Sequence, residues 1–292
     1  MRYTSRQEVL PMVRLAILLA TLATPVLVQD VVAQEAERKP SHCLSIAQSA
    51  PGLEYIQQAS FRDPVPQDRV RLHYIAHASF LIQAHTGTSA ITDFTGFIGN
   101  VDFLPDVVTM NHAHETHWTP FPDPAIPNVL PGWGEEHGAG VDHYVDLGDM
   151  VIRNVSTDIR SRYGAPAEPE GNSIFVFETA GLCIGHLGHL HHMPTDEQFA
   201  ALGRVDVLLA PVDGGYTLPL PRMIETVKRL RSSIVIPMHW FGDGTLQAFL
   251  AAMEEEFAVV RTEDSALTVS LDTLPGQPTV MVLRPRWLSE PD

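Results

Sequence analysis

The sequence predicts a mixed α/β domain in which two β-sheets are covered by helices. Apolar residues at helical spacing occur at 195–202, 221–231 and 244–257, each time between strand-like runs. Those runs are rich in Val, Ile, Leu and Phe and are bounded by Gly, Asp, Asn or Pro, as is typical of buried strands. They cover residues 70–75, 79–84, 90–93, 106–110, 143–147, 151–155, 173–178, 182–185, 205–210, 234–238, 258–261, 267–271 and 279–283. A strand-rich first half followed by strands mixed with helices favours packed sheets with helical outer layers.

The first 33 of the 292 residues have the pattern of a secretory signal peptide. Basic residues precede an apolar run at 15–28, and residues 31–33 supply the usual cleavage positions. An uncleaved membrane anchor is the alternative, but the run is shorter than the ~20 residues that a span needs, and Pro25 interrupts it. We therefore expect a periplasmic or secreted protein with no stable membrane span in its mature chain.

The mature chain is expected to consist of an N-terminal arm at 34–67 and a single domain at 68–292. Acidic residues outnumber basic ones by 35 to 19, which gives a net charge of −16. A nucleic-acid partner would need a basic face. We therefore expect no nucleic-acid partner, while the oligomeric state stays open; the small-molecule substrate that we also expect is implied by the resemblance given below.

The chain has two cysteines, Cys43 in the arm and Cys183 in an apolar strand-like run. Two cysteines do not make the disulfide framework that holds small secreted domains. An oxidising compartment would still allow them to pair. Two unpaired thiols are the expectation, and a bridge is the alternative.

Histidines directly follow three of the predicted strands. His112, His114 and His117 come after the run at 106–110, and a second cluster after the run at 182–185 contains His186, His189, His191 and His192. His239 follows the run at 234–238. One such histidine is more often a core or loop residue, but imidazole is the commonest metal ligand, and strand ends gather at one edge of a sheet. The three clusters together predict a metal site there.

Five segments, three of which contain these histidines, occur in the order and spacing of one known family. They are residues 75–80 (Ile-Ala-His-Ala-Ser-Phe), the turn at Asp93, the histidine segment 112–117, residues 171–188, and residues 205–239. Across about residues 68–285 the chain resembles the metallo-β-lactamase-fold hydrolases, and more narrowly their ascorbate-6-phosphate lactonase-like branch. The resemblance implies a four-layer αββα sandwich with metals at one edge. It also implies that Asp93 supports a ligand and that His77 is structural or supports a ligand.

The activity that the resemblance implies is metal-dependent hydrolysis. A metal-bound hydroxide would attack a small ester, lactone, amide or phosphodiester. Position by position, the implied ligands are His112, His114 and Asp158 for one ion, and His117, His189 and His239 for a second.

Three positions depart from the family's pattern. Thr116 and His189 stand where the family has carboxylates, and Asp158 stands where it has a histidine. The ligand set becomes less negative, so one or two ions remain open, as do zinc, iron and other transition metals.

With threonine at position 116, the general base is undetermined. Asp158 or Glu115 is the candidate base, and His191 or His192 is a candidate proton donor or substrate contact. The alternative function is a degenerate, non-catalytic member of the fold that binds a metal or acts as a scaffold.

The segment at 119–140 contains five prolines and four glycines and has no regular period. A long irregular segment in a compact domain is usually functional or disordered. Because it follows the histidine segment, we expect it to form a wall of the site. Trp118, Trp133 and Trp240 are expected either to line that wall or to lie in the core.

Overall fold

The computed structural model describes residues 38–44, 60–161 and 168–290. The predicted signal peptide at 1–33, and residues 34–37 and 45–59 of the predicted arm, lie outside these ranges, so those predictions stay untested. Within the described ranges, no helix combines the length and the apolar character that a membrane span requires.

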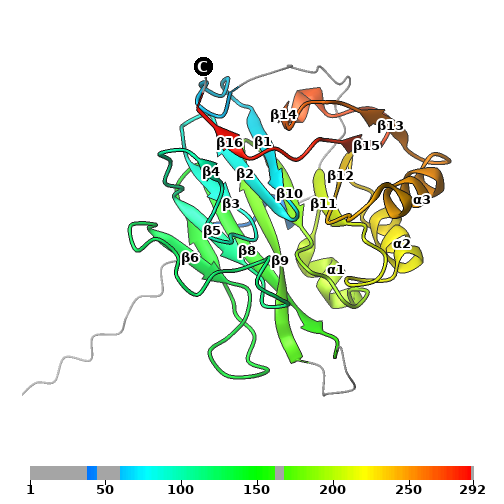
Figure 1. Ribbon diagram of the computed structural model, residues 1–292, viewed down its shortest axis with the longest axis horizontal. Coiled ribbons are helices and arrows are strands. Elements are labelled where there is room, and N and C mark those ends of the chain that lie inside the picture. Colours follow the sequence, from blue (N-terminus) through cyan, green and yellow to red (C-terminus); the bar gives the residue numbers. More distant parts are fainter. Residues whose placement is uncertain (1–37, 45–59, 162–167, 291–292) are drawn as a thin grey trace, which may run out of the picture. The chain divides into compact units, whose positions relative to one another are not determined.

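The strands of the described chain form two β-sheets and a two-stranded ribbon (Figure 1). The six-stranded sheet has the order β14 (Ala266–Val269), β1 (Val70–Ala76), β2 (Ser79–Ala84), β3 (Ser89–Ile91), β5 (Val107–Met110) and β6 (Asn128–Pro131). The eight-stranded sheet has the order β13 (Ala258–Arg261), β15 (Thr279–Val282), β12 (Ile234–Met238), β11 (Val207–Pro211), β10 (Leu182–His186), β9 (Glu168–Thr179), β8 (Met150–Ile159) and β7 (Tyr144–Asp146). The ribbon pairs β16 (Leu288–Ser289) with β4 (Gly99–Asn100), and 3-10 turns lie at His42–Leu44 and Leu271–Thr273.

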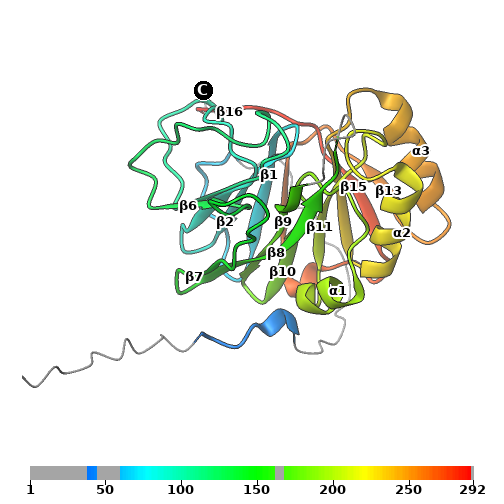
Figure 2. The same ribbon diagram turned by 90° about the horizontal axis from the view of Figure 1, so that it is seen from below.

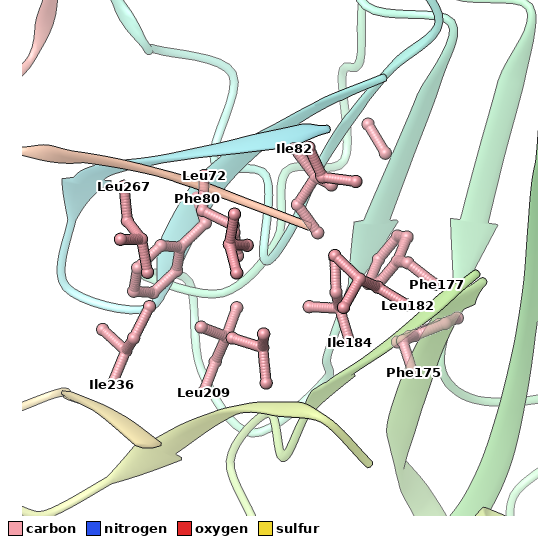
Figure 3. Close-up of a cluster of buried hydrophobic side chains, with 14 of the residues drawn as sticks. Leu72, Phe80, Ile82, Phe175, Phe177, Leu182, Ile184, Leu209, Ile236 and Leu267 are labelled. Atoms are coloured by element: carbon pink, nitrogen blue, oxygen red, sulfur yellow. The ribbon is translucent and has the colours of Figure 1, made fainter. Parts of the chain in front are cut away.

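Alternate side chains of both sheets meet in the core between them (Figure 3). Leu72 and Phe80 project from the six-stranded sheet, and Phe175, Ile184 and Ile236 from the eight-stranded one. Their neighbours along the strands point to the outer faces, because side chains alternate in a strand. In the central strands β10, β11 and β12 every residue is buried, so both faces of the sheet are covered there, which explains their continuous apolar runs.

Helices cover the outer face of the eight-stranded sheet (Figure 2). They are α1 (Asp196–Leu202), α2 (Leu220–Leu230) and α3 (Asp243–Met253), close to the three predicted helices. Over the six-stranded sheet the described chain supplies irregular segments, which bury Phe94, Ile98 and Ile126. Proline lacks the N–H that a helix interior needs, and the prolines between 105 and 127 keep this cover irregular. The predicted mixed α/β class with two packed sheets is confirmed, and in the described chain the helices lie over the eight-stranded sheet.

Strand direction brings the histidine clusters to one edge. β10, β11 and β12 are mutually parallel, and β5 is parallel to β3 and β6. The carboxyl ends of parallel strands share an edge of their sheet, so the segments that follow β10 and β12 lie side by side.

A disulfide joins Cys43 to Cys183 across a sequence separation of 140 residues. The expectation of two unpaired thiols is therefore wrong. The reason lies in tertiary packing: the main chain at Cys43 docks beside the end of α1, where the Cys43 carbonyl accepts a hydrogen bond from Arg204 N–H at 2.7 Å. This contact brings the thiol to the outer face of β10, which a strand pattern cannot show.

Removal of the disulfide is expected to destabilise the fold. Cross-linking distant residues restricts the unfolded chain, and loss of such a bond typically costs roughly 2–5 kcal/mol. Denaturant unfolding of the wild type with and without reductant measures the loss. The Cys43→Ser/Cys183→Ser variant is the control, because reductant should not change its stability. Equal stability of the oxidised and reduced wild type would contradict the expectation.

His73 on β1 is a buried histidine remote from the histidine clusters. Its Nε2 lies 3.1 Å from Ser265 Oγ and 3.3 Å from the Arg286 carbonyl, whereas its Nδ1 is buried without a hydrogen-bond partner. Burial lowers the pKa of His73 from 6.5 to about 4. A charged ring would leave an unsatisfied N–H donor in the interior.

Stability is expected to fall as the pH drops below 6.5. Because the folded pKa of His73 lies below its unfolded value, its contribution is complete above pH 6.5 and is lost as the pH falls toward 4. Each pKa unit is worth about 1.4 kcal/mol. His73→Gln should flatten the pH dependence of the unfolding free energy relative to wild type. The exposed turn histidine offers a control, His85→Gln, and equal slopes for all three proteins would refute the assignment.

Candidate metal centre

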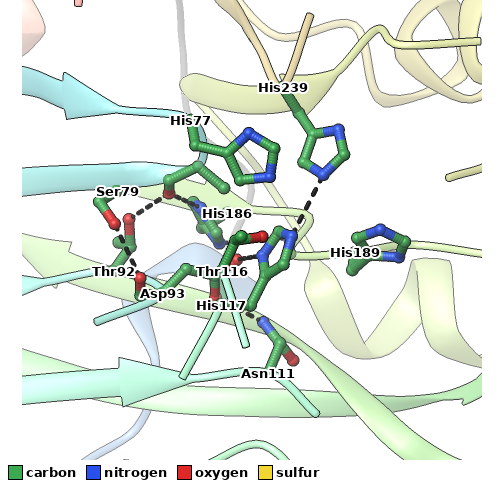
Figure 4. Close-up of polar contacts among 12 residues, drawn as sticks. His77, Ser79, Thr92, Asp93, Asn111, Thr116, His117, His186, His189 and His239 are labelled. Atoms are coloured by element: carbon green, nitrogen blue, oxygen red, sulfur yellow. Dashed lines mark hydrogen bonds and ion pairs between the residues drawn. The ribbon is translucent and has the colours of Figure 1, made fainter. Parts of the chain in front are cut away.

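Four histidines from separate parts of the chain meet at the strand-end edge. Figure 4 shows three of them, His77, His117 and His239. His77 lies in the β1–β2 turn, His114 and His117 in the segment after β5, and His239 directly after β12. One ring nitrogen from each lies within 4.8 Å of the others. We call these four residues the histidine cluster.

The backbone at this edge is held in an uncommon conformation. His77, Asp93 and His239 have φ values of 50°, 42° and 62°. Few non-glycine residues adopt positive φ, and those that do concentrate at functional sites. Two hydrogen bonds to one carbonyl fix the turn: His239 N–H donates to His77 O at 2.9 Å, and the Tyr74 hydroxyl donates to it at 2.8 Å.

Two buried carboxylates stand behind the histidine cluster. Asp93 accepts a short hydrogen bond from His117 Nδ1 and a second one, at 2.9 Å, from Asn111 Nδ2. Asp213 Oδ1 lies 3.1 Å from His239 Nδ1. That contact is not aligned as a hydrogen bond, so its effect on His239 is electrostatic. Each carboxylate favours the proton on the Nδ1 that it faces.

The two carboxylates determine which ring nitrogens of His117 and His239 face each other. With protons on both Nδ1 atoms, His117 and His239 each carry a lone pair on Nε2, and these two nitrogens lie 3.1 Å apart. Two lone pairs at that distance repel unless a cation lies between them. The Nε2 of His77, close to His239, is also buried without a hydrogen-bond partner. The donors present therefore fit a transition-metal ion, which nitrogen ligands bind at about 2.0–2.1 Å in the case of zinc.

Burial keeps His77 and His117 in the form that a metal ion needs. It lowers the pKa of His77 to about 3, with help from His239 and His114, and it lowers the pKa of His117 well below its usual range. Burial raises the pKa of Asp93 to about 6. Burial also acts to raise the pKa of Asp213, but contacts with His239, Thr217 and the Gly215 N–H outweigh it, so that pKa lies below its usual value. Neutral imidazoles are the ligand form.

A chain of histidines leads away from the cluster. His114 Nε2 lies 3.0 Å from His189 Nε2, and His189 Nδ1 lies 2.6 Å from His191 Nε2. His191 Nδ1 accepts a hydrogen bond from the Arg160 N–H at 2.9 Å. A cavity of about 620 Å³ opens beside this chain, and the residues that line it are Ala113, His114, Ile159, Arg160, Ser161, His189, His191, Gly215 and Tyr216.

Of the six predicted ligands, the structure brings three into the cluster: His114, His117 and His239. His189 adjoins them through His114. The other two predicted ligands, Asp158 and His112, lie outside the histidine cluster. Asp158 is exposed on β8, where it accepts a hydrogen bond from Glu170 N–H at 2.9 Å.

His112, the remaining predicted ligand, lies in a separate aromatic setting. Its Nδ1 lies 3.1 Å from Glu168 Oε1, and its ring stacks on Trp133 with centroids 4.6 Å apart. Trp118 packs edge-on against the same ring, whereas Trp240 packs against Tyr74. Two of the three tryptophans thus surround His112, and the third joins the core.

The predicted catalytic residues are also dispersed. Glu115 and His192 are exposed, as is Asp158. The Thr116 hydroxyl lies 2.7 Å from His114 Nδ1, so position 116 supports a ligand even without a carboxylate. The cavity lining comes from residues 113–114, 159–161, 189, 191 and 215–216, so the segment 119–140, predicted to form a wall, does not line this cavity.

The sequence interpretation missed two members of this site. His77 was expected only to support it, and Asp213 was not singled out. A signal existed for Asp213, because it follows β11 just as His239 follows β12. The contact predicted for Asp93, support of a ligand histidine, is present at His117.

Comparisons with known proteins agree with this architecture. A model of the beta-lactamase superfamily domain matches residues 71–239. A UPF0173 metal-dependent hydrolase of Thermoplasma volcanium is 31% identical over 195 residues, which cover 59% of this chain and 83% of that protein. One of Nanoarchaeum equitans is 25% identical over 185 residues, covering 59% and 84%.

The structural comparison shows the same fold. The crystal structure of a metallo-beta-lactamase superfamily protein of Thermotoga maritima superposes with a TM-score of 0.51 at 23% identity, covering 73% of this chain and 98% of that one. The predicted superfamily is confirmed, whereas the ascorbate-6-phosphate lactonase-like branch stays a prediction. The chain therefore belongs to the metallo-β-lactamase superfamily of metal-dependent hydrolases.

Proposed function

We propose that this hydrolase is exported and that its histidine cluster holds a transition-metal ion beside a cavity for a small substrate. The observation that carries the proposal is the pair of Nε2 atoms on His117 and His239, 3.1 Å apart, with a carboxylate behind each ring. Nitrogen-rich ligand sets suit zinc, iron, copper and nickel. Zinc is the ion that we expect first.

The substrate class follows from the chemistry and the cavity. A bound divalent ion supplies Lewis acidity and lowers the pKa of water near it, which serves attack on an ester, lactone, amide or phosphodiester. The chain holds neutral imidazoles in place through Asp93 and Asp213. The cavity of about 620 Å³ lies within the usual range for small-molecule sites, and His114 and His189 face it.

Two features support export. The sequence begins with the basic, apolar and small-residue order of a signal peptide. The Cys43–Cys183 disulfide suits an oxidising compartment such as the periplasm. Sequencing of the N-terminus of the protein recovered from the periplasm tests this part, and an intact Met1 would contradict it.

Metal content and turnover should rise and fall together. The purified mature chain is expected to contain metal, to hydrolyse at least one ester, lactone, amide or phosphodiester in a screen, and to lose turnover on chelation. His117→Ala should lose the metal, because it removes a buried ligand. Elemental analysis measures the metal, and circular dichroism confirms folding. Turnover that survives complete metal removal would contradict the proposal, and bound metal without turnover on any class would favour the non-catalytic alternative.

Substitution of Asp213 and of Asp158 distinguishes two ligand sets. The set predicted from the sequence includes Asp158, whereas the structure shows the histidine cluster with Asp213 behind it. Asp213→Asn should weaken metal binding roughly 10- to 100-fold, the usual cost of losing a carboxylate that orients a ligand histidine. Asp158→Asn, the matched control, should leave affinity unchanged, since Asp158 is exposed outside the cluster. Competition with a chromogenic chelator measures both. The reverse result would restore Asp158 as a ligand.

A further inference from the structure

The hydrogen bonds of the histidine chain have one consistent direction, set by the main chain. The Arg160 N–H can only donate, so His191 Nδ1 accepts, and a neutral His191 carries its proton on Nε2. That N–H donates to His189 Nδ1 at 2.6 Å, which places the proton of a neutral His189 on Nε2. The His189 Nε2–H in turn donates to His114 Nε2 at 3.0 Å.

The last ring completes the series. If His114 Nε2 accepts, the proton of His114 is on Nδ1, where the Thr116 hydroxyl accepts it at 2.7 Å. His114 therefore offers a lone pair on Nε2, as His117 and His239 do. His189 is the exception, because it offers an N–H.

We infer that His189 is not a metal ligand but a fixed N–H donor to the substrate, with its tautomer imposed by His191 and the Arg160 main chain. The inference rests on the proposed metal function of the cluster. A nitrogen that bears a proton has no lone pair for an ion, although the superfamily resemblance implied a ligand at this position. The centre would then hold one ion, bound by His77, His114, His117 and His239.

The surroundings of His189 indicate what its N–H binds. His189 is 2% exposed, yet it lines the cavity next to His114. Once His114 Nε2 binds an ion, the His189 N–H loses its acceptor, and a buried donor without an acceptor is costly. A substrate oxygen in the cavity supplies the acceptor. An oxygen that gains negative charge during attack, on a carbonyl carbon or on phosphorus, would receive this hydrogen bond most strongly.

Selective ¹⁵N-histidine NMR of the mature chain loaded with Zn²⁺ tests the tautomer directly. His189 is expected to show a protonated Nε2 and an unprotonated Nδ1. His191→Phe, which keeps an aromatic ring but removes both nitrogens, should convert the His189 signals to a mixture of tautomers while leaving metal content unchanged. A His189 Nε2 that is unprotonated and shifted by Zn²⁺ would overturn the inference.

Metal stoichiometry provides the second arm. The wild type and His189→Asn should each bind one Zn²⁺ per chain, with affinities within about threefold of one another. His85→Asn, at an exposed turn, controls for loss of a histidine. Loss of an ion, or a drop of tenfold or more, in His189→Asn alone would show that His189 is a ligand. A wild type that binds no metal would instead defeat the proposed function, while the NMR of the metal-free protein would still report the tautomer.

Discussion

The facing nitrogens of His117 and His239 are the constraint on which the rest of this centre depends. Each ring has a carboxylate at its Nδ1, so neither can easily turn its lone pair away from the other. The arrangement is unfavourable without a cation and favourable with one. The two aspartates therefore set the preference for a metal ion, because they favour the proton of each imidazole on Nδ1 and leave the two Nε2 lone pairs facing each other.

This constraint is held by a network that joins both sheets. Asp93, after β3, is bound by Asn111, after β5, and the Asn111 side-chain oxygen accepts from Ser173 N–H on β9 at 2.8 Å. Gly188 makes room for it, because a Cβ there would lie 2.3 Å from Asn111 Nδ2. The Asn172 side-chain oxygen accepts a hydrogen bond from the main-chain N–H of His189 at 3.0 Å. The Asn111–Ser173 hydrogen bond thus fixes Asp93, which follows a strand of the six-stranded sheet, relative to His189, which follows a strand of the eight-stranded sheet.

Local patterns predicted much of the fold and part of the centre. The helices were predictable because their spacing and the Thr195 capping box are encoded within a few residues. The three histidine-containing segments of the sequence were recognisable because each follows an apolar run. His77 joins the site only through tertiary pairing, since nothing local shows that the β1–β2 turn meets this edge. Asp213 follows β11, so the argument from strand ends could have found it.

Backbone geometry explains why two of the predicted ligands, Asp158 and His112, lie outside the histidine cluster. The apolar run on β8 suggested an end near residue 155, but the strand continues to Ile159, and alternation between buried Thr157 and Ile159 leaves Asp158 exposed. His112 and His114 would face the same way only in an extended chain. Residues 112–116 form bends and a turn instead, so His112 points toward Trp133.

Charge balance favours the proposal of a single ion at this site. Imidazole ligands are neutral when they bind a metal ion, and the two carboxylates behind the histidine cluster supply about two negative charges when ionised, which match one divalent cation. A second divalent ion would place uncompensated positive charge in a largely buried site, where charge is costly. At positions 116 and 189, where the resemblance implies carboxylates, this chain has a threonine and a histidine, so no carboxylate there offsets a second ion. The hydroxyl and the imidazole form hydrogen bonds at this edge instead, and His189 lines the cavity.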